Sequence, residues 1–165
     1  MTRNQICAVT IALIMVFGMG TIDRTLAETK EKVKATATSI NIKFEKIDVG
    51  DEDGHMIAIV ENKQVWSAEG SDEKSTAIAR GLMDFNPKTG KGTFTGYSIR
   101  NYKNGEKWFS RFEGKPAGKG SWEGTHTYNG GTGKYEGMTG SGTWKTYSLA
   151  PGISIIEAEG ERIYR

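Results

Sequence analysis

The chain has few cysteines and prolines for its 165 residues, and it has no long hydrophobic segment. Its one cysteine, Cys7, cannot form an intramolecular disulfide, so no disulfide framework supports the fold. The longest apolar run, residues 6–17, is shorter than the roughly 20 residues that a membrane-spanning helix needs. The three prolines, Pro87, Pro116 and Pro151, each lie in a segment with turn composition, where the missing N–H interrupts no strand ladder.

The N-terminus has the pattern of a secretory signal peptide. The basic Arg3 precedes the apolar run, and the small-residue pattern Thr25-Leu26-Ala27 follows it. We expect cleavage after Ala27 and export to the periplasm or the extracellular space, without further contact with a membrane. A membrane anchor is the alternative, and the shortness of the apolar run argues against it. The expected division is a signal peptide at 1–27, an N-terminal extension at 28–37 and a β-barrel domain at 38–165.

The sequence also lacks an excess of charge of either sign. Its 22 basic and 20 acidic residues alternate, as in Lys30-Glu31-Lys32, and form no stripe that could neutralise a run of phosphates. Nucleic acid is therefore not an expected partner. The two histidines, His55 and His126, lie far apart without a spacing typical of metal ligands, and no phosphate-binding motif is present. We expect neither a metal nor a cofactor.

No helical period is present, and short segments of two-residue alternation are separated by turn residues. This pattern predicts an all-β chain with eight strands. Glycines within the strands permit sharp coiling and favour a closed barrel over a sandwich. The expected fold is a single eight-stranded antiparallel up-and-down β-barrel of the calycin-like kind. The expected strands are residues 40–49, 55–60 with 64–67, 76–85, 93–102, 107–113, 120–128, 141–148 and 153–164.

Two local predictions can be compared directly with a structure. Asn104-Gly105 predicts a hairpin with a type I′ turn between the strands on either side of it. On the first strand, Ile40, Ile42 and Phe44 alternate with polar residues and are expected to share one face. If that face fills the interior, Glu45 lies outside. The alternative is a Glu45 carboxylate inside the lumen, where an apolar cavity would raise its pKa and suit it to proton transfer.

The most distinctive segment is the glycine-rich stretch from Asn129 to Trp144, whose aromatic residues distinguish it from a disordered linker. It predicts a strand-turn-strand corner of a closed barrel. Within it, Gly130-Gly-Thr-Gly-Lys-Tyr-Glu-Gly-Met-Thr-Gly140 resembles the Gly-Gly-(Ser/Thr)-Gly-x-aromatic-x-Gly signature of the allene oxide cyclase-like and dirigent-like barrels. Weaker similarity at Phe44-Glu45, Asp53-Gly54-His55 and Gly96-Tyr97 extends the resemblance over residues 38–164.

The resemblance implies a secreted or organellar eight-stranded barrel, often trimeric, with a mostly apolar lumen for a lipid-like or phenolic molecule. Plant allene oxide cyclases use a glutamate on the first strand, an asparagine two residues later, and a Ser-Pro pair in the following turn. Glu45 lies where that glutamate would be. Ile47 replaces the asparagine and Asp53-Gly54 replace the Ser-Pro pair, so the group that holds a water is missing. The resemblance therefore transfers the barrel and not the enzyme's identity.

Seven residues are candidates for a site. His55 follows a turn, where it could act as an acid or base or could stabilise the turn. His126 shares a face with Trp122 and Tyr128, so it could be the polar group of a ligand pocket or part of an aromatic core. The candidate catalytic residues are Glu45, His55 and His126, and the candidate ligand-binding residues are Tyr97, Trp122, Tyr128 and Trp144.

Three functions are compatible with these residues. The leading expectation is an exported barrel that binds a small, largely apolar molecule in its lumen, as a homotrimer or homodimer. The second is a cofactor-independent isomerase or cyclase, which requires at least one of the three catalytic candidates to point into a cavity. The third is a structural or interaction barrel whose lumen is filled by its own aromatic side chains, so that no cavity larger than a few waters remains.

Overall fold

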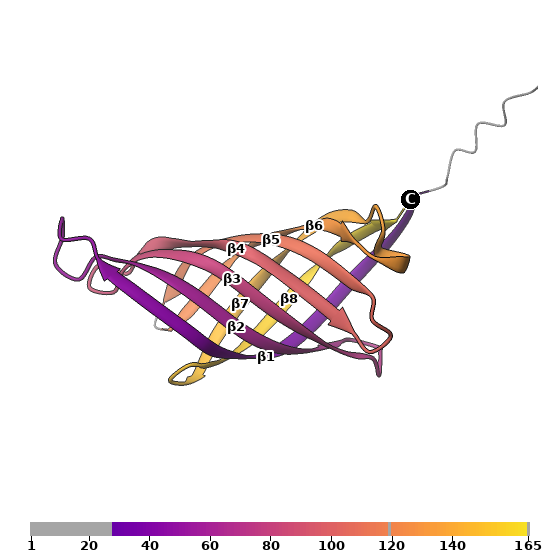
Figure 1. Cartoon of the computed structure of the whole chain (residues 1–165), viewed down its shortest axis with the longest axis horizontal. Coiled ribbons are helices and arrows are strands. Elements are labelled where there is room, and N and C mark those ends of the chain that lie inside the picture. Colours follow the sequence, from indigo (N-terminus) through magenta and orange to yellow (C-terminus); the bar gives the residue numbers. More distant parts are fainter. Residues whose placement is uncertain (1–27, 119, 165) are drawn as a thin grey trace, which may run out of the picture.

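The computed structural model describes residues 28–118 and 120–164 and shows a closed barrel of eight antiparallel strands, in which each strand pairs with its sequence neighbours and β8 pairs with β1 (Figure 1). The predicted all-β, eight-stranded up-and-down barrel is confirmed. The predicted signal peptide lies outside the described residues and stays a prediction. The strands are β1 (Thr29–Asp48), β2 (Met56–Ala68), β3 (Lys74–Asn86), β4 (Lys91–Tyr102), β5 (Lys107–Gly118), β6 (Ser121–Gly131), β7 (Thr139–Ala150) and β8 (Ile153–Tyr164).

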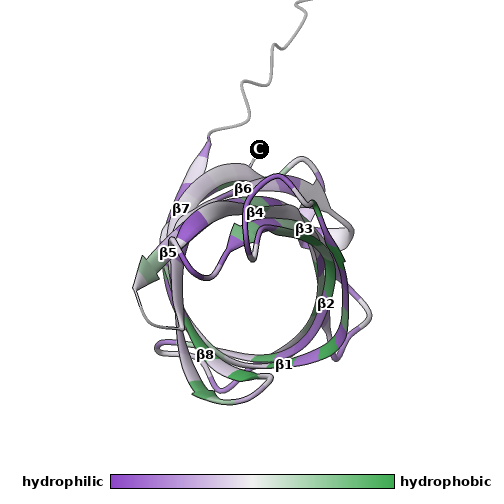
Figure 2. Cartoon of the chain, turned by 90° about the vertical axis from the view of Figure 1, so that its left-hand side faces the viewer, coloured by the Kyte–Doolittle hydropathy of each residue, from purple (hydrophilic) through white to green (hydrophobic). Residues whose placement is uncertain are grey.

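Side chains alternate between the lumen and the outer surface, as the strand pleat requires. Viewed along its axis, the barrel is a closed ring, and green hydrophobic and purple hydrophilic segments adjoin each other on β1 and β2 (Figure 2). The two sides of the lumen differ in composition. On β1 and β3 the buried positions are small and include Ala35, Ala37, Ala77 and Ala79, whereas β5, β6 and β7 contribute most of the large aromatic rings, with Trp66 on β2 as an exception. This difference in side-chain size leaves space beside the alanines.

Glycines allow the aromatic rings to lie flat against the barrel wall. Gly81 and Gly96 face each other across β3 and β4, and Gly114 and Gly124 do so across β5 and β6. A Cβ atom at Gly96 would lie 2.6 Å from Cζ of Phe112, whose ring covers this position. Here glycine is required by close approach, since a side chain would displace either the ring or the neighbouring strand.

One end of the barrel is closed by the glycine-rich segment that connects β6 and β7. This connection contains a single 3₁₀ turn, η1 (Gly133–Tyr135), and it places two fully buried side chains, Tyr135 and Met138, against Trp108 and Tyr128. The Tyr135 ring stacks on Tyr102 with the ring centroids 5.2 Å apart. The prediction of a strand-turn-strand corner is confirmed, and the corner also forms a plug.

The beginning of β1 corrects two predictions. Residues 29–37 are part of β1 and pair with β8, so they do not form an N-terminal extension. Ile40, Ile42 and Phe44 are all exposed and do not share one face, because a bulge inserts Ile42 between Asn41 and Lys43. Phe44 therefore lies opposite the buried Val60, while Ile40 lies opposite the exposed Lys63.

Two further differences are local. β2 is one continuous strand through residues 61–63, where a bend or turn is expected from the sequence. The hairpin between β4 and β5 is confirmed, but its turn is not type I′, because Asn104 does not have a positive φ. The Gly105 N–H donates to the Tyr102 carbonyl, and Gly105 itself has a φ of 86°. This is a three-residue loop that ends in a glycine bulge.

None of the helices among the described residues has the length and hydrophobicity needed to cross a membrane.

Candidate functional site

The lumen contains a cavity of about 270 Å³. It begins at Trp108 and Tyr128, next to the plug, and reaches the turns between β5 and β6 and between β7 and β8 at the opposite end. All eight strands contribute to its wall. An eight-stranded barrel has room for one small ligand, and this lumen is only partly filled by its own side chains.

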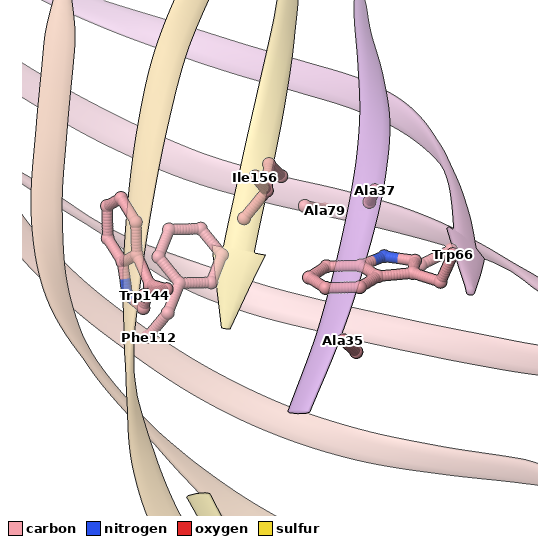
Figure 3. Packing of buried hydrophobic residues seen from close by; sticks show 8 residues of the cluster. Ala35, Ala37, Trp66, Ala79, Phe112, Trp144 and Ile156 are labelled. Atoms are coloured by element: carbon pink, nitrogen blue, oxygen red, sulfur yellow. The ribbon is translucent and has the colours of Figure 1, made fainter. Parts of the chain in front are cut away.

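The middle of the cavity is apolar. Figure 3 shows Phe112 and Trp144 together on one side, with Trp66, Ala37 and Ala79 across the lumen from them. The rings of Phe112 and Trp144 meet edge to face with their centroids 6.3 Å apart, a favourable arrangement for aromatic pairs.

The indole N–H groups in this region have acceptors within the wall. Nε1 of Trp66 donates to Oε1 of Gln64 at 2.9 Å, and Nε1 of Trp144 donates to the Thr125 carbonyl at 3.0 Å. These tryptophans therefore offer a ligand mainly the apolar surfaces of their rings.

The end of the cavity next to the plug contains the guanidinium group of Arg100. Arg100 is only 5% exposed, and its Cζ lies 4.0 Å from the centroid of the Trp66 ring and 4.5 Å from that of Trp108. Burial lowers the pKa of Arg100 to about 10, so the group is still charged at neutral pH. Among the described residues, no carboxylate lies within ion-pair distance of it.

A second arginine, Arg162 on β8, is buried beside the first. Its Cζ lies 5.6 Å from the ring centroids of both Trp108 and Tyr128. Its Nη1 lies 3.5 Å from Oε2 of Glu31, a half-exposed carboxylate at the barrel end that also accepts a hydrogen bond from the Tyr164 hydroxyl. The Nε–H groups of Arg100 and Arg162 are both buried and have no hydrogen-bond acceptor among the described residues.

His126 lies in the cavity wall on β6, with its imidazole packed edge to face against the Tyr128 ring. Burial lowers the pKa of His126 to about 4, and the charges of Arg100 and Arg162 act in the same direction. At neutral pH the imidazole is therefore uncharged, with one ring nitrogen able to donate and the other able to accept a hydrogen bond.

The other two catalytic candidates lie outside the lumen. Glu45 is on the outer surface and pairs with Lys43 at 3.2 Å. His55 bridges two carboxylates, with Nδ1 2.6 Å from Asp51 and Nε2 2.8 Å from Asp84. The hydrogen bond to Asp84, followed by that to Asp51, raises the pKa of His55 above its usual value. This geometry favours the turn-stabilising interpretation of His55, because the His55 ring ties the β1–β2 turn to β3.

The aromatic candidates divide in the same way. Trp122, Tyr128 and Trp144 all line the cavity. Tyr97 does not, because the glycine before it, Gly96, occupies the inward position and the Tyr97 side chain is 61% exposed on the outer surface. A role for Tyr97 in lumen binding is therefore not possible in this barrel.

The sequence analysis missed the two buried arginines. The signal that could have identified them is their position in the alternation. Phe94 on β4 and Ile156 on β8 face the lumen. Arg100 and Arg162 each lie an even number of residues further along the same strand, so their side chains point to the same side. That signal conflicts with the general rule that charged side chains are seldom buried without a partner.

No protein-family model matches the chain, and no curated protein matches it.

Within the part of the chain that the structure describes, no three acidic, histidine or cysteine side chains are grouped so that they could hold a metal ion.

Solved structures do match the barrel. The pterocarpan synthase dirigent protein GePTS1 aligns with a TM-score of 0.53 and 11% sequence identity over 86% of this chain and 88% of that one. The pterocarpan synthase dirigent protein PsPTS1 aligns with a TM-score of 0.48 and 9% identity over 84% and 96% of the two chains. The first likeness agrees with the resemblance of the glycine-rich segment. In fold, the chain is a dirigent-like β-barrel.

Proposed function

We propose that the protein binds a small, largely apolar molecule in the lumen of its barrel. The observation that carries this proposal is the cavity itself, an internal space of about 270 Å³ whose wall combines aromatic rings with polar side chains at its two ends. Ligand sites in proteins have this character, in which apolar walls supply affinity and a few polar groups supply orientation.

The size of the cavity argues against a purely structural barrel. At about 30 Å³ for each water of liquid volume, the space corresponds to roughly nine waters. A lumen filled by its own side chains would leave space for only a few. The cavity therefore favours a compact ligand, of the size of a substituted phenol or a short acyl chain.

The four tryptophans of the chain, Trp66, Trp108, Trp122 and Trp144, all line the cavity, so intrinsic fluorescence reports on its occupancy. We expect the neutral compound 3-phenylpropanamide to bind and to change this fluorescence. Trp122 packs on Phe85 and Phe94 in the wall. The substitution Trp122→Ala should weaken binding about tenfold, or about 1.4 kcal/mol, because it removes a large aromatic contact.

Tyr97→Ala is the matched control, since it removes an aromatic ring from the outer surface and should leave the affinity unchanged. Calorimetry provides a second measurement that does not depend on tryptophan. If Trp122→Ala binds the amide as tightly as the unmodified protein does, or if the unmodified protein binds neither the amide nor its carboxylate counterpart 3-phenylpropanoate at millimolar concentration, lumen binding is wrong.

A second candidate function is an isomerase or cyclase without a cofactor, acting on a reactive lipid-like or phenolic intermediate. One observation favours it: His126 places an uncharged imidazole in the cavity wall, with one ring nitrogen that can donate and one that can accept a hydrogen bond to a reacting group. The likeness to a dirigent protein supports the barrel for this function and does not identify the reaction.

The test uses any compound that co-purifies with the protein and is released on denaturation. If His126 acts as a catalyst, the protein should convert that compound or its precursor, and His126→Gln should lower kcat by at least about a hundredfold with little change in KM. An equal fall in binding and turnover would indicate a packing role for His126 instead.

We also propose that the protein is a homo-oligomer. The outer surface of β2, β3 and β4 carries large exposed apolar side chains, and such patches mark interaction sites on soluble proteins. Charges of both signs, including Arg80 and Glu61, lie among them, so a second copy of the same surface is an electrostatically compatible partner. The apolar patch consists of Ile57, Ile59, Val65, Leu82, Tyr97 and Ile99.

A further inference from the structure

The lumen has an imbalance of charge that its own residues do not correct. Arg100 and Arg162 place two positive charges inside the barrel, and the only carboxylate within ion-pair distance, among the described residues, is the half-exposed Glu31. Burying an ionised group is costly unless the charge is paired and its donors are bonded. Two guanidinium groups in one apolar cavity therefore require an explanation.

Stacking on aromatic rings explains only part of the arrangement. Trp66 and Trp108 lie against the guanidinium of Arg100, and a ring face attracts a cation. However, ring faces offer no acceptor to the N–H groups at the edge of the guanidinium plane. The Nε–H groups of Arg100 and Arg162 have no acceptor among the described residues, so the stacked rings hold the arginines in place and leave donors unused.

The two arginines share one location. Both lie against the Trp108 ring, and both act on His126. Because His126 is uncharged at neutral pH, it adds no further positive charge, and its ring can donate to an anion. The plug end of the lumen is therefore a positive site at the bottom of an apolar cavity.

We propose that the ligand of the lumen is an amphipathic anion with a carboxylate group, which lies between Arg100 and Arg162 at the plug end. Its apolar part would extend along Phe112 and Trp144 toward the turns at the other end. A carboxylate suits this site because it is planar and accepts two parallel hydrogen bonds from a guanidinium. This inference rests on the proposed lumen binding and adds the chemical class of the ligand.

The test compares two probes of nearly identical shape, 3-phenylpropanoate and 3-phenylpropanamide. They differ in the charge and the acceptors of the head group. We expect the purified protein to bind the carboxylate at least tenfold more tightly than the amide at pH 7, measured by calorimetry and tryptophan fluorescence. Equal affinity for the two probes would overturn the inference and leave lumen binding intact, whereas binding of neither would contradict both.

Variants then assign the preference to the arginines. Arg100→Met keeps a long side chain between the two indole rings but removes the charge, and it should lower carboxylate affinity at least tenfold without weakening the amide. Arg111→Met is the matched control, since Arg111 is exposed on the outer surface of β5 and its loss changes the net charge equally. A similar loss in both variants would mean that long-range charge alone attracts the probe, and would overturn the site.

A measurement on the unsubstituted protein covers the case in which Arg100→Met does not fold. His126 has a pKa of about 4, caused first by burial and then by the two arginine charges. A carboxylate bound between the arginines offsets their charge, so the pKa of His126, followed by NMR, should rise by at least one unit with the carboxylate. The amide should produce no such rise. An equal rise in the pKa of His126 with both probes, or no rise with either probe, would contradict the proposed position of the anion.

Discussion

Replacing Gly96 by alanine is expected to lower the free energy of unfolding by about 3 kcal/mol, near the upper end of the cost of overpacking. The new Cβ would lie 2.6 Å from both Cα of Gly81 and Cζ of Phe112, and closer still to the Arg80 carbonyl oxygen. Two of these three atoms belong to the backbone of β3, so the clash cannot be relieved by a change of rotamer. For a chain of this size, the midpoint of thermal unfolding should fall by roughly 10 °C.

Gly50→Ala is the control, because it strains the backbone conformation without creating a steric clash. Gly50 lies in the turn after β1 with a φ of 83°, and a Cβ there meets nothing within 4 Å. Its replacement should cost only about 1 kcal/mol, the strain of a left-handed conformation. Thermal unfolding followed by circular dichroism measures both variants. If Gly96→Ala were no more destabilising than Gly50→Ala, the result would contradict the close approach of β3 and β4 at Gly96.

The architecture was predictable from the sequence because strand alternation and turn residues are local signals. Pro151-Gly152 separates β7 from β8, and Asn104-Gly105 separates β4 from β5, so that strand boundaries follow from a few residues. The orientation of β1 was not predictable in this way. A single bulged residue, Ile42, reverses the alternation, and nothing in the local sequence marks it.

Site residues were predictable where the strand alternation and the polarity of the side chain indicated the same orientation. Trp122, His126 and Tyr128 share a face, and that face lines the cavity. For Arg100 these two signals disagreed, because the strand alternation directs its side chain inward while its charge favours solvent. Such conflicts between a local rule and the fold are expected at functional sites, which is why the two arginines carry the inference about the ligand.

The second large effect expected is on assembly. Leu82→Lys should convert the proposed homo-oligomer to a monomer, because Leu82 is 57% exposed within the apolar patch and lies opposite Ile59 on β2. At an interface, the ammonium group would lose its water without gaining a partner in either copy. Native mass spectrometry and light scattering at micromolar concentration should show a trimer or dimer for the unsubstituted protein and a monomer for Leu82→Lys.

The control for assembly is Thr143→Lys, which adds the same charge at an exposed position on β7, away from the patch. It should retain the oligomer. Both variants should keep the circular-dichroism spectrum of the folded barrel, as is usual for surface substitutions, so a change in assembly would not reflect misfolding. A monomer at every concentration before substitution, or an oligomer that tolerates Leu82→Lys, would contradict the proposed interface at this patch. Because the patch is on the outside and the cavity on the inside, Leu82→Lys should also leave the affinity for 3-phenylpropanamide unchanged.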